Sequence, residues 1–394
     1  MKFIDLALQQ ARIRPNIEKR ILGVLDHGHY VLGPEIEELE SRLSQYVGVS
    51  HALACASGTD ALLMALMAYE IGPGDAVFTT PFSFFATAEV ISLLGATPVF
   101  VDIEESSFNI DPVLLEAAIR DVANDERTHP VYRYLTADET LAPKAVIAVD
   151  LFGLPADYLA ISNIAQKYNL AVVEDAAQSF GAELNGQKAC ALADIACTSF
   201  YPAKPLGCYG DGGMCFTNDD RMAEIMRSIR IHGMGDHQYD NIRVGINGRL
   251  DTIQAAVLLS KFEIFPEEVV LRNTAANRYE TLIGSLSSLK LPKVPEGAQS
   301  AWAQYSLLAQ NQSQRERLRS RLNKENIPTA IYYPKPLHLQ KAFTPLGYRE
   351  GDFPVSESCA GRIFSLPMHP YITAQEQEKV AGALNSSFAE CPPL

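Results

Sequence analysis

The chain has 394 residues, which is long enough for one large and one smaller domain. Of these residues 47% are hydrophobic and 20% are charged, a composition typical of a globular protein. Its 33 basic and 47 acidic residues give a formal net charge of −14, which argues against a nucleic-acid-binding surface. No apolar run is as long as a membrane span, and the first residues lack a signal-peptide pattern, so we expect a cytoplasmic protein without membrane contact.

The first two-thirds of the chain alternate between short apolar runs and helical patterns. Two helical stretches lie within residues 12–46 and are separated by residues 27–34. We then expect strands at 52–56, 76–79, 97–101, 145–150, 171–175 and 196–199. Helices are expected between most of them, at 59–69, 85–94, 112–122 and 158–168. This alternation predicts an α/β fold with a mostly parallel sheet covered by helices on both faces.

The remaining segments indicate how the chain is divided. Residues 123–144 are polar and aperiodic, and we interpret them as a surface insertion. A long helical pattern begins near Thr252 and continues through 272–283 into a more mixed C-terminal third. We therefore expect a large domain over 1–255 and a smaller α+β domain over 256–394.

The seven cysteines form no CxxC pair and have no metal-ligand spacing. We expect free thiols in a reducing compartment, with neither a disulfide framework nor a metal site.

An acidic pair ends the apolar strand expected at 171–175. Glu174 and Asp175 follow Val172 and Val173, and a buried acid is costly unless a cation or a hydrogen-bond donor accompanies it. Asp175 is therefore a candidate site residue, although an Asp at this position could also serve only as a helix N-cap.

Lys204 follows the next strand and lies between Pro202 and Pro205, just before a glycine cluster at 207–213. The two prolines keep the segment out of a helix and hold the lysine on a fixed loop. An amine nucleophile needs such a position in a partly desolvated pocket, which lowers its pKa. An isolated lysine is otherwise usually a solvated surface charge.

A third strand end carries Ser57, Gly58 and Thr59, immediately before an expected helix. Backbone N–H groups and the helix dipole make such a turn suitable for a phosphate, and an ordinary N-cap is the alternative. The chain contains no P-loop and no strand-linked GxGxxG motif, so neither nucleoside triphosphate hydrolysis nor dinucleotide binding is favoured.

These three strand ends together match the needs of pyridoxal phosphate. That cofactor requires a lysine for its aldehyde, an acid for its ring nitrogen and a cup for its phosphate. Lys204, Asp175 and the turn at Gly58 and Thr59 provide these groups on one predicted sheet. The sequence therefore predicts a pyridoxal-phosphate enzyme.

The chain also resembles, over nearly its whole length, the DegT-type sugar-nucleotide aminotransferases of fold type I. The resemblance rests on the motifs SGTDAL (57–62), VEDAAQSFGA (173–182), SFYPAKPLG (199–207), GDGG (210–213), RVGINGRLDTIQAA (243–256), YYPKPLHLQ (332–340) and SLPMHP (365–370). It implies a large domain with a mostly parallel, mixed sheet between helices, and a smaller C-terminal α+β domain.

The resemblance implies a cofactor role for each matching residue. Lys204 would form the Schiff base and then move the proton, and Asp175 would pair with the pyridinium nitrogen. Gln178 would form a hydrogen bond with the ring hydroxyl, and Phe84 would stack on the ring. The phosphate would be held by Gly58, Thr59 and Ser199, and by Asn247 from the neighbouring subunit of a homodimer.

The resemblance also implies a substrate site. Arg249 would contact a carboxylate of the donor or of a uronate, and Tyr332 and Tyr333 would line the sugar-nucleotide site. The implied reaction transfers the amino group of L-glutamate to a keto sugar on UDP. The preferred acceptor is UDP-2-acetamido-2-deoxy-3-oxo-D-glucuronate, as in the branch that serves bacterial O-antigen assembly.

Four alternatives stay open at this point. One is an aminotransferase for a 4-keto-6-deoxy sugar on UDP, dTDP or GDP. Another is the C-3 dehydratase branch, which has a histidine where this chain has Lys204. A third is a sensor that binds the cofactor without turnover. The last is a cysteine desulfurase, for which Cys359 and Cys391 are the candidate nucleophiles.

Overall fold

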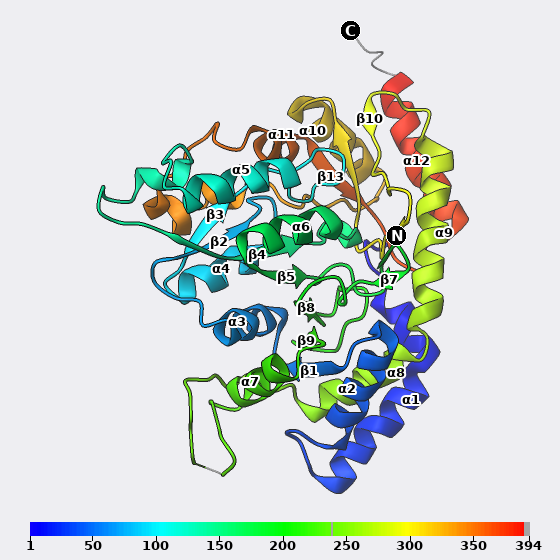
Figure 1. Cartoon of the computed structure of the whole chain (residues 1–394). Helices are drawn as coiled ribbons and strands as arrows, with labels where there is room; N and C mark the ends of the chain where they lie inside the picture. The colour runs from blue at the N-terminus through cyan, green and yellow to red at the C-terminus, as the bar shows by residue number, and fades with distance from the viewer. Residues whose placement is uncertain (238, 390–394) are drawn as a thin grey trace.

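A central seven-stranded sheet organises the computed structural model, which describes residues 1–237 and 239–389 (Figure 1). The strand order is β1-β9-β8-β5-β4-β2-β3. The strands are β1 His51–Cys55, β2 Asp75–Thr79, β3 Thr97–Phe100, β4 Ala142–Val149, β5 Ala171–Asp175, β8 Ile195–Ser199 and β9 Gly213–Thr217. The pairs from β8 to β3 are parallel, and β9 is antiparallel to both its neighbours. The other six strands therefore run in one direction.

Helices cover both faces of this sheet, as the sequence predicted. One face is packed by α3 (Gly58–Ala68), α4 (Ala86–Leu93) and α7 (Asp220–Arg230). The opposite face is packed by α5 (Pro112–Ala123), α6 (Tyr158–Tyr168), α2 (Pro34–Val47) and α8 (Thr252–Phe262), and α1 (Leu6–His27) packs on α8. From Ala145 to Ala148, successive residues of β4 alternate between the two cores, so this part of the strand is apolar at every position.

The C-terminal part builds a separate core. It contains α9 (Phe265–Ile283), α10 (Gln312–Lys324), α11 (Pro354–Arg362) and α12 (Ala374–Ala389) around a small sheet of β10 (Leu289–Lys290), β12 (Tyr305–Ala309) and β13 (Ile363–Leu366). Figure 1 shows α9 and α12 along one side of the molecule. A third sheet joins β11 (Ala298–Gln299) to β6 (Glu183–Leu184) and β7 (Gln187–Lys188). The domain boundary expected between residues 255 and 256 stays a prediction.

The six expected strands and four expected helices of the sheet region are confirmed, with ends that differ by at most three residues. Two expectations need correction. The strand β9 was missed because it begins with Gly213 inside a glycine cluster, and glycine weakens a strand pattern. The long helical pattern from Thr252 is two helices, α8 and α9, because Pro266 in the first turn of α9 has no backbone N–H to continue the preceding helix.

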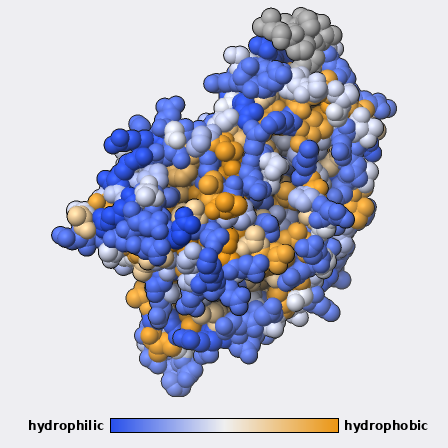
Figure 2. All heavy atoms as spheres, turned by 45° about the horizontal axis from the view of Figure 1, so that its top comes forward, coloured by the Kyte–Doolittle hydropathy of each residue, from blue (hydrophilic) through white to orange (hydrophobic). Residues whose placement is uncertain are grey.

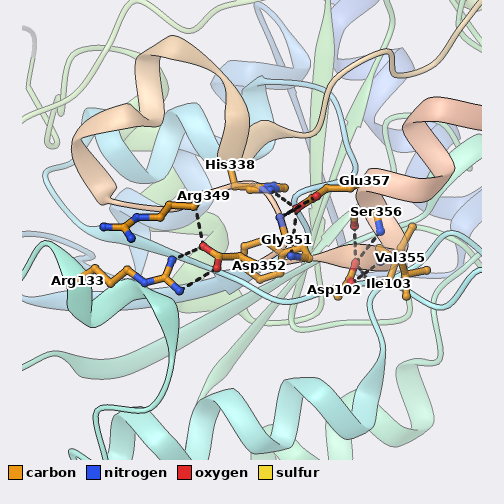
Figure 3. Close-up of polar contacts among 11 residues, drawn as sticks. Asp102, Ile103, Arg133, His338, Arg349, Gly351, Asp352, Val355, Ser356 and Glu357 are labelled. Carbon is orange, nitrogen blue, oxygen red and sulfur yellow. Dashed lines mark hydrogen bonds and ion pairs between the residues drawn. The ribbon is translucent and has the colours of Figure 1, made fainter.

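The segment 123–144 is more firmly attached than a free surface insertion. It contains a 3₁₀ turn, η1 (Pro130–Arg133), in which Val131 is buried. The His129 ring lies 2.9 Å from the Phe100 carbonyl oxygen. Figure 3 shows the Arg133 guanidinium against Asp352, with N···O distances of 2.5 and 2.9 Å. The segment therefore anchors part of the C-terminal region to the sheet.

The surface of the molecule is mainly hydrophilic on the face that faces the viewer in Figure 2. On the face shown in Figure 2, hydrophilic residues cover most of the area, and hydrophobic residues appear between them in separate groups. Among the helices of the described residues, none combines the length and the hydropathy that crossing a membrane would require.

Candidate active site

A pocket of about 590 Å³ lies at the edge of the sheet where β1, β2, β4, β5 and β8 end. These strands are parallel to one another, so their carboxyl ends meet there, as is usual for ligand sites in α/β sheets. Nine of the eleven expected site residues line the pocket: Gly58, Thr59, Phe84, Asp175, Gln178, Ser199, Lys204, Tyr332 and Tyr333. Residues from six separate parts of the sequence are thus brought together.

Lys204 reaches the pocket from the loop that follows β8. Its backbone N–H donates to the Tyr201 carbonyl at 2.9 Å, which forms a turn between the flanking prolines. Burial lowers the pKa of the Lys204 amine, and the negative charge of Asp175 opposes this effect. A larger share of this amine is therefore neutral than of an exposed lysine, as a nucleophile or a base requires.

Asp175 is the last residue of β5 and is only 5% exposed. Its Oδ2 accepts a hydrogen bond from the Thr87 hydroxyl at 2.8 Å, and its Oδ1 accepts one from the Ala177 N–H at 3.2 Å. Burial raises the pKa of Asp175, while the Thr87 hydrogen bond and the Lys204 charge lower it. No helix begins in the residues that directly follow Asp175, so this residue is not a helix N-cap, and it lines the pocket.

The turn at Ser57 to Thr59 begins α3, and Ser57 is its N-cap. The Ser57 Oγ accepts from the Asp60 N–H at 3.0 Å. A Cβ at Gly58 would lie 2.7 Å from the Ser199 Cβ, so only glycine lets the end of β8 pack this closely on the helix start. The result is a narrow cradle of backbone N–H groups and hydroxyls that suits a phosphate.

Gln178 links the cofactor side of the pocket to the tyrosines. Its Oε1 accepts from the Phe152 N–H at 2.8 Å, and its Nε2 donates to the Tyr333 hydroxyl at 3.2 Å. Burial raises the pKa of the Tyr333 hydroxyl, which therefore stays protonated. Phe84 is 57% exposed, with its ring centroid 6.5 Å from that of Tyr333, so one face is free for a ligand.

Asn247 and Arg249 are the two expected residues that do not line the pocket of their own chain. Asn247 is exposed and forms a β-bridge with Ile231, whereas Arg249 is half-buried and forms a bridge with Cys55 at the end of β1. The role of Asn247 in a neighbouring subunit and the carboxylate contact of Arg249 stay predictions.

Several pocket residues were not predicted from the sequence: Ile4, Ser83, Thr87, Asp211 and Gln304. Ser83 and Thr87 had a detectable signal, because two hydroxyls four residues apart follow the expected strand 76–79. Ile4 had none, since it precedes the first helix and lies outside the alternation of strands and helices.

The cysteines of the described residues are free and buried: Cys55, Cys190, Cys197, Cys208, Cys215 and Cys359. Cys359 lies in α11, and burial raises the pKa of its thiol to about 12, the opposite of an activated nucleophile. Cys391 lies outside the described residues. No group of three His, Cys, Asp or Glu side chains within 1–237 and 239–389 is arranged to hold a metal ion.

The residues of the pocket fit pyridoxal phosphate. An amine with a lowered pKa, a buried carboxyl and a glycine-dependent cradle at a helix N-terminus surround one cavity. These are the three groups that the cofactor requires.

The sequence profile of the DegT/DnrJ/EryC1/StrS aminotransferase family matches residues 11–385 of this chain. The UDP-2-acetamido-2-deoxy-3-oxo-D-glucuronate aminotransferase of Pseudomonas aeruginosa is 45% identical over 386 residues, which cover 98% of this chain and 100% of that protein. A pleiotropic regulatory protein of Geobacillus stearothermophilus is 40% identical over 96% of this chain and 95% of that protein.

The fold agrees with these sequence matches. The crystal structure of a DegT DnrJ EryC1 StrS aminotransferase from Brucella abortus is similar to this structure with a TM-score of 0.91 and 48% sequence identity. The similarity covers 98% of this chain and 99% of that one.

Proposed function

Because the chain belongs to the DegT/DnrJ/EryC1/StrS aminotransferase family, we propose that it transfers the amino group of L-glutamate to a keto sugar carried on UDP. Its cofactor is pyridoxal phosphate. The observation that carries the proposal is that Lys204 and Asp175 line one pocket and act electrostatically on each other.

Each residue of the pocket has a definite task in this reaction. When bound, pyridoxal phosphate withdraws electrons from the carbon that loses its proton, and it carries the amino group between donor and acceptor. Lys204 Nζ would hold the cofactor aldehyde, and once free it would take the proton as a neutral amine and return it as an ammonium group. Asp175 holds the ring nitrogen in its protonated form. The Ser57 to Thr59 turn and Ser199 hold the phosphate, and Gln178 orients the ring hydroxyl.

The proposed acceptor is UDP-2-acetamido-2-deoxy-3-oxo-D-glucuronate, a sugar of bacterial polysaccharide assembly. The Pseudomonas relative that carries this name is 45% identical over 98% of this chain and 100% of its own length, which supports the assignment. Tyr332 and Tyr333 line the pocket, and we propose that they contact the acceptor. We also propose that the uronate or glutamate carboxylate meets Arg249, although Arg249 does not line the pocket of its own chain. The alternative acceptor is a 4-keto-6-deoxy sugar on UDP, dTDP or GDP, which would use the same cofactor residues.

We further propose a homodimer whose two sites each borrow Asn247 from the other subunit. The proposal is supported by the position of Asn247, which is exposed and outside the pocket of its own chain. Its amide would then add a donor to the phosphate cradle.

An absorbance titration tests the proposed activity. The purified protein with pyridoxal phosphate should show the visible-edge band of the cofactor bound covalently to lysine. L-Glutamate should replace that band with a band of the amine form of the cofactor. The keto sugar nucleotide that restores the first band is the acceptor, so the titration also separates the 3-keto uronate from the 4-keto-6-deoxy alternatives.

The first prediction concerns Lys204 itself. Lys204→Ala should lose the covalent band and all turnover, because no other amine lies on the loop between Pro202 and Pro205. Lys144→Ala, at the exposed start of β4, is the matched control and should keep both. A covalent band that persists in Lys204→Ala would disprove the assignment. A parent protein that binds the cofactor but reacts with no amino donor would indicate a sensor instead.

A further inference from the structure

Two buried hydroxyls lie behind the site acid, and neither has a role in the proposed reaction. Thr87 Oγ1 donates to Asp175 Oδ2 at 2.8 Å, and Ser83 Oγ lies 2.9 Å from Thr87 Oγ1. The exposed fractions are 3% for Ser83, 1% for Thr87 and 5% for Asp175. All three residues line the pocket, so the chain of hydroxyls borders the cavity.

The direction of these hydrogen bonds follows from the chemistry of the groups. An ionised carboxylate only accepts, so the single hydroxyl proton of Thr87 goes to Asp175. The Thr87 oxygen is then free to accept the proton of Ser83. With the Ala177 N–H on Oδ1, each oxygen of Asp175 has one donor, which fixes the plane of the carboxylate.

The two hydroxyls come from a different part of the sheet than the acid. Ser83 lies in the loop after β2, and Thr87 lies in the first turn of α4 (Ala86–Leu93). Asp175 ends β5, and β4 lies between β2 and β5 in the sheet. The loop therefore crosses the end of β4 to reach the carboxyl. This long-range contact between buried polar groups is costly to build unless both partners are satisfied.

We propose that Thr87, supported by Ser83, is a positioning residue that aims the Asp175 carboxylate at the ring nitrogen of the cofactor. The inference rests on the proposed function, because it takes the ring of pyridoxal phosphate as the occupant of the pocket.

The electrostatics of Asp175 agree with this role. Burial raises the pKa of Asp175, and the Thr87 hydrogen bond is the first influence that opposes it, ahead of the Lys204 charge. The other titratable groups that act on Asp175 are Tyr333, Tyr158 on α6 and Cys197 on β8. Burial raises the pKa of each of these three, so they stay neutral. Removal of the Thr87 hydroxyl should therefore leave Asp175 protonated up to a higher pH.

The test is Thr87→Val, which removes the hydroxyl and keeps the branched shape. The dissociation constant of pyridoxal phosphate, measured by fluorescence, should rise about tenfold because one charge-assisted hydrogen bond is lost. The acid limb of the pH profile of cofactor absorbance should move to higher pH. Thr87→Ser should restore both values towards those of the parent, since it restores the donor.

The matched control is Thr79→Val. Thr79 is as buried as Thr87, and its hydroxyl donates only to the Ile147 carbonyl at 3.0 Å. It should alter thermal stability without moving the pH profile. Ser83→Ala, expected to change the same two readouts less, serves as the test if Thr87→Val does not fold.

Two results would overturn the inference. In the first, Thr87→Val has the same cofactor dissociation constant and the same acid limb of the pH profile as the parent. In the second, Thr79→Val shifts these two quantities as much as Thr87→Val does. The failure of the proposed function has a different signature, because the parent protein itself would then give no covalent band with pyridoxal phosphate.

Discussion

Glu174, the residue before the site acid in β5, forms a buried pair with Asp150 at the end of β4. Asp150 accepts hydrogen bonds from the Ala156 N–H and from the hydroxyls of Tyr158 and Ser179, at 2.9, 2.9 and 2.6 Å. Glu174 accepts from the Cys190 and Leu192 N–H groups at 2.6 and 3.0 Å. Burial raises the pKa of Asp150 to about 7 and that of Glu174 well above its usual value. The folded protein therefore keeps a proton on this pair.

The pair predicts that stability falls as the pH rises. A carboxyl in the unfolded chain loses its proton near pH 4, whereas the folded pair keeps one up to about pH 7 or above. The stabilisation is thus complete at acid pH and is lost as the pH rises through the folded pKa, at up to roughly 1.4 kcal/mol per pH unit.

Glu174→Gln should flatten this dependence, because the amide has no proton to lose. We expect the melting temperature of the variant to fall by several degrees less than that of the parent between pH 5 and pH 8, as measured by calorimetry. Glu224→Gln, an exposed acid on α7, is the control and should follow the parent. Parallel curves for the parent and Glu174→Gln would contradict the prediction.

At the scale of the elements, helix α11 (Pro354–Arg362) depends on a cap from a distant strand. Its N-cap residue is Phe353, whose apolar side chain offers no acceptor. Asp102, just after β3, replaces the missing cap: Oδ2 accepts from the Val355 N–H at 2.8 Å, and Oδ1 accepts from the N–H and the hydroxyl of Ser356 at 2.9 and 2.6 Å. Figure 3 shows this contact beside the Arg133–Asp352 ion pair.

Asp102→Ala should therefore destabilise the protein by about 2–4 kcal/mol, since it removes both a helix cap and the acceptor of buried donors. Asp102→Asn should cost less, because one oxygen remains. Urea unfolding followed by circular dichroism measures the change. Asp138→Ala, an exposed acid in the 123–144 segment, should stay within about 0.5 kcal/mol of the parent. An Asp102→Ala variant as stable as this control would rule out the capping role.

At the scale of the whole molecule, the proposed dimer can be distinguished by experiment from a subunit whose active site is built from one chain alone. Asn247 is outside the pocket of its own chain, whereas Lys204 is inside it. A site that takes Asn247 from the partner subunit must then combine residues of two chains.

Mixed dimers of Lys204→Ala and Asn247→Ala subunits test this arrangement. Each variant alone should be nearly inactive, but half of the dimers after random exchange are mixed and hold one site free of both changes. We expect about a quarter of the parental activity to return, measured by turnover of the unseparated mixture after co-expression. Activity no higher than the sum of the separate variants would indicate that each site is built from one chain.

Local patterns in the sequence were sufficient for most of the fold. Apolar runs located the parallel strands, and polar or glycine residues at their carboxyl ends located Gly58, Asp175 and Lys204, because parallel strands end at a common edge. The family resemblance then assigned tasks to these residues. The limits were also local. Pro266 divides a helix that periodicity alone made continuous, and the glycine at the start of β9 weakens its strand pattern.

The tertiary structure decided which distant residues touch. The Thr87 hydroxyl on Asp175, the Asp102 cap on α11 and the proton shared by Asp150 and Glu174 join residues from separate elements. No spacing along the chain encodes such contacts, because they depend on strand order and on which loop crosses which strand end. A sequence determines the chemistry that each residue offers. The pKa and the partner of a buried group are properties of the folded surroundings, and only the fold brings those together.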